Sequence, residues 1–238
     1  MNETAILCWS AAAIGTIHTL LGPDHYLPFV AMSRAGSWSP KKTMVITSLC
    51  GVGHVLGSIV LGLVGVALGT AVFHLEQIES LRGEIAAWML IGFGLAYFAW
   101  SSIRAFRRRP HSHWHSHDGG DVHCHEHQHD TAHLHVHADS ASAPRLSMTP
   151  WILFTIFLFG PCEPLIPLLM YPAAAGSLWL VALVTLIFAS STILTMTFIV
   201  WIATSGRLAL RPGLMGRFAE PLAGLVVFLC GIAIKAGF

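Results

Sequence analysis

Two histidines and an aspartate lie within one short apolar stretch, Ile17-His18-Thr19-Leu20-Leu21-Gly22-Pro23-Asp24-His25-Tyr26-Leu27-Pro28. The surrounding residues 4–33 are long and apolar enough to span a bilayer. An ionised side chain at mid-membrane costs roughly 2.5–3.5 kcal/mol on insertion scales, so a sequence that keeps such groups there is expected to use them. Proline lacks an N–H and clashes with the preceding helical turn, so the Gly-Pro pair predicts an interrupted helix. We therefore expect an ion site at a break in the first membrane helix.

The composition indicates an integral membrane protein. Hydrophobic residues make up 54% of the 238 positions and charged residues only 11%, whereas soluble domains have about 25% charged residues. Long apolar runs favour transmembrane helices over a barrel, whose strands alternate at every second residue. The formal net charge of +1 argues against nucleic acid as a partner, and the lipid bilayer is the expected surrounding. The N-terminus lacks the basic region of a signal peptide, so we expect the first span to stay in place.

The apolar runs predict an all-α, polytopic membrane protein with six transmembrane helices. Their expected ranges are 4–33, 43–72, 85–105, 149–173, 176–204 and 217–236. A short acidic link with Glu76, Glu79 and Glu84 is expected before the third helix. The chain is thereby divided into a first three-helix repeat (1–109), a loop (110–145) and a second three-helix repeat (146–238).

The two halves carry a related motif. Gly22-Pro23-Asp24-His25 in the first helix corresponds to Gly160-Pro161-Cys162-Glu163 in the fourth, and Leu, Pro and a Gly-Ser pair follow each of them. Because each half has an odd number of helices, the halves are expected to face opposite ways in the membrane. Inverted repeats with interrupted helices at matching positions are a known transporter plan, with the site at the midplane between the repeats. We therefore expect the first and fourth helices to be interrupted.

Positive charge predicts the orientation, since short cytoplasmic links carry an excess of Lys and Arg. Links one–two, three–four and five–six hold most of the basic residues, whereas the opposite side holds only Arg82 and Lys235. We expect an inner (cytoplasmic) membrane protein with both termini outside and the 110–145 loop in the cytoplasm. The basic residues of the cytoplasmic links are Arg34, Lys41, Lys42, Arg104, Arg107, Arg108, Arg109, Arg145, Arg207, Arg211 and Arg217.

Residues 110–145 differ in composition from the rest of the chain. Histidine alternates with other residues, and few large apolar side chains are available to form a core. The loop is therefore expected to be disordered without a ligand. Neutral imidazole binds metal ions, so the loop is expected to capture or buffer ions and to be dispensable for the transport step. Its eleven histidines are His111, His113, His115, His117, His123, His125, His127, His129, His133, His135 and His137.

The predicted ion site combines the first two helices. His18 and His25 would lie about 10.5 Å apart along a straight helix, too far to share an ion comfortably, but the Gly-Pro break removes this obstacle. His54 lies in Gly51-Val52-Gly53-His54-Val55-Leu56-Gly57-Ser58, whose glycines allow two helices to approach closely. We predict that both histidines of the first helix converge with Asp24 and His54 on one metal ion.

Further candidates come from the second half of the chain. Cys162 and Glu163 occupy the break that corresponds to Asp24-His25, and both are candidate metal ligands. Packing is the alternative for Cys162. Glu163, the only acid in its span, is expected to be buried and to act either as a ligand or as a proton carrier that couples transport. A hydroxyl-rich patch in the fifth helix either lines the pathway or bonds its own helix. It comprises Ser190, Ser191 and Thr192.

These motifs resemble those of the nickel/cobalt transporter family, within the larger lysine-exporter-like superfamily. That family carries a first-helix His followed, after four residues, by Asp-His, and a second-helix Gly-His-Ser type motif. Here five residues separate His18 from Asp24-His25, and the second motif reads Gly53-His54-Val55-Leu56-Gly57-Ser58. Similar chains include nickel/cobalt efflux proteins with a His-rich loop, urease-accessory permeases and sulfite-exporter-like membrane proteins. The Gly-Pro-Cys segment is also similar to that of thiol-disulfide electron carriers. The resemblance covers six spans in outline and implies transport of nickel or cobalt.

The sequence thus predicts a secondary transporter of a divalent transition-metal ion, and not an enzyme. No Walker motif is present, so energy is expected from an ion gradient or a partner rather than from ATP. No permanent cofactor is expected. The transported ion is expected to be nickel or cobalt, with zinc and copper as alternatives, because imidazole ligands suit all of these metals.

Two other functions stay open at this point. An exporter of sulfite or an organosulfur anion would prefer Arg or Lys near mid-membrane, where the expected spans have neither. A transmembrane thiol-disulfide electron carrier would need two facing cysteines, for which Cys50 and Cys162 are the candidate pair. The exact metal, the direction of transport, the coupling ion and the formation of homo-oligomers are not determined by these residues.

Overall fold

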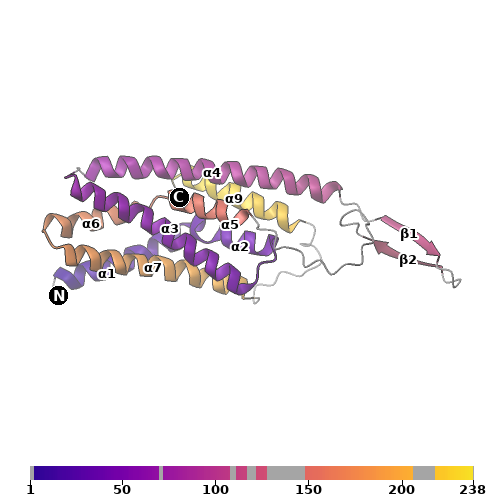
Figure 1. The fold of residues 1–238 in the computed structure, drawn as a ribbon, viewed down its shortest axis with the longest axis horizontal. Helices are drawn as coiled ribbons and strands as arrows, with labels where there is room; N and C mark the ends of the chain where they lie inside the picture. The colour runs from indigo at the N-terminus through magenta and orange to yellow at the C-terminus, as the bar shows by residue number, and fades with distance from the viewer. Residues whose placement is uncertain are drawn as a thin grey trace, which may run out of the picture.

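The computed structural model describes residues 3–69, 72–107, 111–116, 122–127, 148–205 and 218–237. Within these ranges the chain forms an elongated bundle of helices and a two-stranded hairpin (Figure 1). The elements, in chain order, are α1 (Glu3–Leu21), η1 (Pro23–His25), α2 (Leu27–Ala35), α3 (Pro40–Ala67), α4 (Val72–Arg107), β1 (His111–Ser116), β2 (Val122–His127), α5 (Thr149–Phe159), α6 (Leu165–Ala174), α7 (Leu178–Thr204) and α9 (Ala219–Lys235).

Four of the described helices are long and apolar enough to cross a membrane: α1, α3, residues Phe73–Arg107 of α4, and α7. Two shorter apolar helices, α5 and α6, follow one another along the chain. At this level the prediction of a helical, membrane-embedded protein is confirmed.

Two helical segments are interrupted where the Gly-Pro pairs stand. α1 ends immediately before Gly22-Pro23, the 3₁₀ turn η1 follows, and α2 begins at Leu27. α5 ends immediately before Gly160-Pro161, and α6 begins at Leu165. Proline explains both stops, because its ring removes a backbone donor and occupies space that the preceding turn needs.

α4 begins earlier along the chain than the sequence suggests. The prediction of an acidic link with Glu76, Glu79 and Glu84 is wrong, because α4 is helical from Val72 onward. Glu is a good helix former, so local propensity does not oppose this. Glu79 is fully buried and pairs with Arg82, whereas Glu76 and Glu84 are exposed. The acidic residues therefore lie on different faces of one helix.

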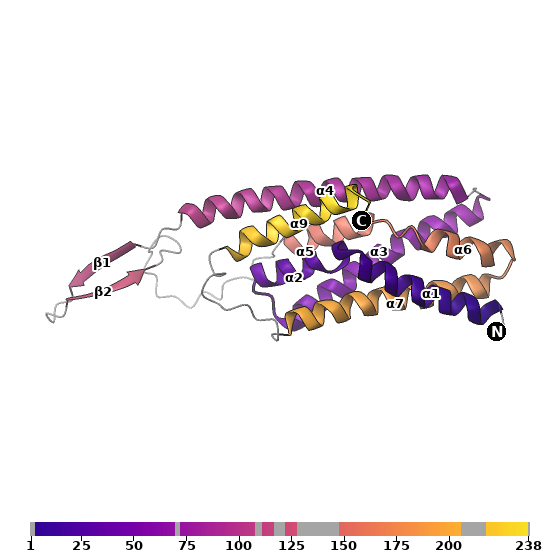
Figure 2. The same cartoon turned by 180° about the vertical axis from the view of Figure 1, so that it is seen from behind.

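Glycines allow a close helix contact in the bundle, between α4 and α9. A Cβ atom added to Gly94 of α4 would lie 2.7 Å from the Cα of Phe228, and one added to Gly224 of α9 would lie 2.8 Å from the Cα of Phe98. The two helices therefore pack backbone against backbone, and Figure 2 shows them side by side from behind. Close approach through small residues is typical of helices that associate in membranes.

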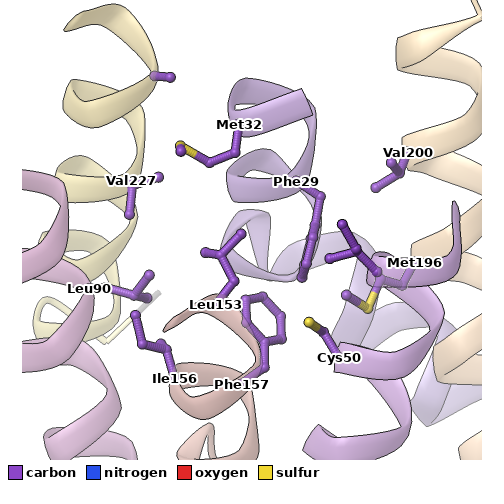
Figure 3. Packing of buried hydrophobic residues seen from close by; sticks show 12 residues of the cluster. Phe29, Met32, Cys50, Leu90, Leu153, Ile156, Phe157, Met196, Val200 and Val227 are labelled. Atoms are coloured by element: carbon purple, nitrogen blue, oxygen red, sulfur yellow. The ribbon is translucent and has the colours of Figure 1, made fainter. Parts of the chain in front are cut away.

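Two apolar clusters form the interior. Figure 3 shows the first, in which the ring centroids of Phe29 and Phe157 lie 4.6 Å apart, in the same cluster as Cys50 and Met196. The second cluster contains Cys162 and residues of α6 and α7. Both interrupted segments therefore contribute to the core. α2 and α5 contribute to the first cluster, and the break between α5 and α6 contributes to the second.

The His-rich segment contains an antiparallel hairpin. Its register pairs His111 with His127, His113 with His125, and His115 with His123. The register therefore places six histidines directly opposite one another along the two strands. The other histidines of the segment lie outside the described residues: His117, His129, His133, His135 and His137. Disorder stays a prediction for residues 110, 117–121 and 128–145, which are also outside the described ranges.

Candidate metal centre

Three imidazole rings meet in the interior of the bundle. His18 comes from the end of α1, His25 from η1, and His54 from the middle of α3. The ring centroid of His25 lies 4.7 Å from that of His18 and 4.9 Å from that of His54, and the other two centroids are 6.4 Å apart. His25 and His54 are each only 3% exposed. The structure thus brings these three predicted residues together.

The break in the first membrane segment turns His25 back toward His18. In a straight helix seven residues span about 10.5 Å, more than twice the 4.7 Å between these ring centroids. Gly22 permits the turn, because a Cβ atom there would lie 2.5 Å from Nδ1 of His25. Gly160 leaves room at the second break, where a Cβ atom would lie 2.8 Å from Nδ1 of His54. Both Gly-Pro breaks therefore shape the space around the rings.

The Nε2 atoms of His18, His25 and His54 are buried and have no hydrogen-bond partner among the described residues. Buried polar atoms are nearly always hydrogen-bonded, so each exception calls for an explanation. A neutral imidazole nitrogen carries a lone pair that coordinates metal ions. The ring nitrogens without a partner are therefore candidate metal ligands, and ring nitrogens of His18 and His54 lie within 4.8 Å of one another.

Cys162 adds a sulfur atom from the second break. Its Sγ atom and one ring nitrogen each of His18 and His54 all lie within 4.8 Å of one another. Metal–ligand bonds of about 2.0–2.1 Å to nitrogen and 2.3 Å to sulfur place neighbouring ligand atoms about 3.5 Å apart. A small inward movement of these side chains would bring three ligand atoms to such distances. Imidazole together with thiolate suits borderline and soft metal ions.

Asp24 and the backbone orient His25. Nδ1 of His25 lies 3.1 Å from the carbonyl oxygen of Gly22 and 3.3 Å from Oδ1 of Asp24. With either acceptor, Nδ1 carries the proton and donates it, which leaves Nε2 free to coordinate an ion. Carboxylates that hold a metal-binding histidine in this way are common partners outside the ligand sphere. The structure therefore places Asp24 beside a candidate ligand, where it orients the ring.

A cavity of about 690 Å³ adjoins this cluster. His18, Asp24, His25 and Glu163 line it, together with apolar residues of α1 and α9. Because the side chain of Glu163 is exposed, the cavity meets the molecular surface there. A cation in the cavity would be close to two carboxylates and two imidazoles.

Glu163 does not take the buried position that the sequence suggests. Its side chain is exposed, because the residue lies in the break between α5 and α6 and not on a helix face that packs inward. The fully buried carboxylate near this break is Glu79 of α4, which accepts a hydrogen bond from the backbone N–H of Cys162 at 2.8 Å. The reasoning from the cost of burial therefore applies to Glu79 instead.

The hydroxyl patch of α7 divides into two parts. Ser190 and Ser191 donate hydrogen bonds to the carbonyl oxygens four residues earlier, at 2.7 and 2.8 Å, and Ser190 is exposed. Thr192 is fully buried, and its Oγ1 has no hydrogen-bond partner in the described part of the chain. A Cβ atom added to Gly15 of α1 would lie 3.2 Å from this oxygen. Thr192 therefore lies where α1 and α7 touch, while the two serines bond their own helix.

Three residues near the site were not indicated by the sequence patterns: Ser58, Glu79 and Arg82. Glu79 accepts hydrogen bonds from Ser58 and Arg82, and it also holds the backbone of Cys162. The available signal was the spacing, since residues three apart on a helix can form an ion pair. Because the sequence patterns assign Glu79 and Arg82 to a link between helices, the spacing did not indicate an ion pair there.

Comparisons of the chain with protein-family models, with curated proteins and with solved structures found no match. The described chain is a bundle with four membrane-length helices and a buried cluster of imidazoles and a thiol. Its function has to be inferred from that cluster.

Proposed function

We propose that the protein is a secondary membrane transporter of a divalent transition-metal ion. Nickel and cobalt are the foremost candidates, with zinc and copper as alternatives. The supporting observation is a buried cluster of three imidazoles and one thiol, which comprises His18, His25, His54 and Cys162. Polar groups inside apolar helices are costly and usually functional. A bound ion would satisfy the nitrogen atoms that have no partner among the described residues.

Both interrupted segments contribute to this cluster, which supports a six-span plan with inverted repeats. His18 and His25 flank the first break, and Cys162 lies in the second. In transporters built this way, the ion site lies near the midplane between the two repeats. We propose that the six spans are α1–α2, α3, α4, α5–α6, α7 and α9.

We propose an inner-membrane orientation with both termini outside and the hairpin in the cytoplasm. Arg34 at the end of α2 donates a hydrogen bond to the carbonyl oxygen of Ala203 at the end of α7, at 3.0 Å. Arg104 near the end of α4 pairs with Glu220 at the start of α9, at 4.0 Å. These contacts place basic helix ends together at one end of the bundle. In Figure 1 the hairpin lies beyond that same end. An excess of Lys and Arg is typical of cytoplasmic links.

The His-rich hairpin is proposed to capture ions before or after transport, outside the transport site itself. Its register gives three directly opposed pairs of histidines. The hairpin is separate in sequence from all members of the buried cluster.

Replacing residues 111–137 with a Gly-Ser linker of equal length tests the proposed function. We expect the variant to keep one nickel or cobalt ion per chain and to transport at saturating metal, because the cluster residues lie outside this segment. The intact protein should bind additional ions through the histidines of the loop. Elemental analysis of the purified protein and transport into proteoliposomes measure the two results. A variant without any bound ion would overturn the core site. A linker variant that binds an ion but no longer transports it would show that the hairpin is needed for transport itself, and would overturn its proposed role in ion capture alone.

Glu163 is proposed to couple proton movement to ion movement. Its carboxylate lines the same cavity as His18 and His25, so it can exchange protons close to the ion. Glu163→Gln keeps the shape but cannot take up a proton, so we expect normal metal binding and a net transport that no longer responds to a pH gradient. Glu76→Gln, at an exposed position of α4, is the matched control. Transport that stays as pH-driven as in the parent would leave Glu163 only a pathway role.

The two other functions have weaker support in the described residues. An anion exporter would need an uncompensated cation inside the bundle. Arg82 lies within α4, not in a link, but it pairs with Glu79 at 2.5 Å. An electron carrier would need two facing thiols. Cys50 and Cys162 are both free and belong to different apolar clusters. Metal transport is therefore the function that the described residues support best.

A further inference from the structure

A charged network joins α4 to the second break. Glu79 is fully buried, and its carboxylate accepts hydrogen bonds from the Ser58 hydroxyl, from the Arg82 guanidinium at 2.5 Å and from the backbone N–H of Cys162 at 2.8 Å. Arg82 also donates to the carbonyl oxygen of Leu158 at 2.9 Å. Removing two charges from water costs several kcal/mol per ion, and apolar residues of similar volume are often at least as stable. Such a pair therefore calls for a role besides stability.

The network replaces one broken helical hydrogen bond. Leu158 and Cys162 are four residues apart, so in a continuous helix the N–H of Cys162 would donate to the carbonyl of Leu158. The break between α5 and α6 separates these two groups. Arg82 then donates to the carbonyl, and Glu79 accepts from the N–H. Both backbone groups are satisfied, and each is held at a defined position against α4.

Small residues let the network reach the break. A Cβ atom on Gly57 of α3 would lie 2.8 Å from the Leu158 oxygen and would also contact the Arg82 guanidinium. A Cβ atom on Gly83 of α4 would lie 2.8 Å from Cγ of Pro161. A larger residue at Gly83 would therefore push Pro161 away from α4, and one at Gly57 would displace the Arg82 guanidinium or the Leu158 carbonyl. The contact between the ion pair and the break is therefore built by several residues.

We infer that the Glu79–Arg82 pair positions Cys162 as a thiolate ligand and thereby sets the preference of the site for soft or borderline divalent ions. This inference rests on the proposed function. Glu79 holds the backbone nitrogen of Cys162, and the Sγ atom of the same residue lies within 4.8 Å of ring nitrogens of His18 and His54. Thiolate favours zinc-like and softer ions, whereas carboxylate and carbonyl ligands suit magnesium and manganese. Glu79 and Arg82 are positioning residues, since they act on the ion through Cys162.

Cobalt(II) titration tests this inference, because thiolate ligation gives a near-ultraviolet charge-transfer band that imidazole ligation does not. The variant with a Gly-Ser linker in place of residues 111–137 lacks both Cys124 and the histidines of the loop, and it serves as the parent. We expect the band in the parent and its loss in Cys162→Ser. Glu79→Gln should lose the band or need about tenfold or more cobalt to form it, as for other residues that support metal ligands. Visible cobalt absorption from the imidazoles should remain.

Glu76→Gln is the matched control, since Glu76 is exposed on the same helix three residues earlier. We expect it to behave as the parent. Competition gives a second readout: cadmium should displace cobalt more effectively than manganese does in the parent, and this difference should shrink in Glu79→Gln.

The outcomes separate the two proposals. A parent that binds no cobalt overturns the proposed function. A parent that binds cobalt without the thiolate band overturns only the role of Cys162 and its positioning pair. A folded Glu79→Gln variant with unchanged band and cobalt affinity overturns the role of Glu79. If that variant does not fold, Glu79→Asp keeps the charge but shortens its reach toward the Cys162 N–H. If Glu79→Asp forms the thiolate band at the same cobalt concentration as the parent, the inference is overturned. If it needs more cobalt to form the band, the inference is supported.

Discussion

Replacing His25 with alanine is expected to abolish metal transport while the protein stays folded. The ring of His25 lies between the other two, with centroid distances of 4.7 Å and 4.9 Å, and its Nε2 has no hydrogen-bond partner among the described residues. Residues that merely support a metal ligand contribute about 10–100-fold in affinity or activity. Removing a proposed ligand should therefore lower transport by about 100-fold or more. In proteoliposomes, the transport rate of the variant should then equal the rate measured with protein-free vesicles.

The folded state should tolerate this change. Nδ1 of His25 can donate to the Gly22 carbonyl at 3.1 Å or to Oδ1 of Asp24 at 3.3 Å, and one such hydrogen bond contributes about 1 kcal/mol. We expect a small decrease in the melting temperature of the detergent-solubilised protein. His74→Ala is the control, because His74 is exposed near the start of α4. Near-parental transport by His25→Ala would contradict a single shared site. Equal losses in both variants would contradict a specific role for His25.

Replacing Gly94 with leucine is expected to separate α4 from α9 and to destabilise the protein severely. A Cβ atom at Gly94 would lie 2.7 Å from the Cα of Phe228, and a backbone cannot move aside as a flexible side chain can. Overpacking of a core typically costs about 1–3 kcal/mol and occasionally more. Here a whole helix has to shift, so we expect a value at the upper end. Thermal unfolding and size-exclusion chromatography of the purified protein measure the loss.

Gly92→Leu is the matched control for this prediction. Gly92 lies two residues earlier on α4, and a Cβ atom there would have no atom within 4 Å. The Gly92→Leu variant should therefore be as stable as the parent. The ion pair between Lys235 and Glu84 also joins α4 to α9, at 2.7 Å, but exposed pairs contribute little and should not rescue Gly94→Leu. Equal stability of the two variants would contradict backbone-to-backbone packing of these helices.

Local chemistry is enough to predict the two breaks and the three histidines. Proline lacks the N–H that a helix needs, so Gly22-Pro23 and Gly160-Pro161 favour a break, whereas Pro172 without a preceding glycine stays inside α6. An ionisable group in an apolar span is costly wherever the span packs. His18, His25 and His54 could therefore be named as candidate ligands before any contact was known.

The apolar helices themselves give no such local signal about which side faces inward. Apolar residues are spread evenly around α7, and its hydroxyl residues do not mark a separate polar face, so no stripe identifies the buried side. Only packing against α1 distinguishes the buried Thr192 from the exposed Ser190. The exposed position of Glu163 likewise depends on where the second break lies relative to its neighbours.

The positioning of Cys162 is the feature that only the tertiary structure decides. Glu79 is 83 residues from Cys162 in the chain, and nothing near either residue in the sequence announces their hydrogen bond. Glu79 can be buried because Arg82 and Ser58 satisfy it and because a distant break leaves an N–H unpaired. Local residue patterns determine where a helix stops, whereas the groups that replace its lost hydrogen bonds come from whichever helix packs beside the break.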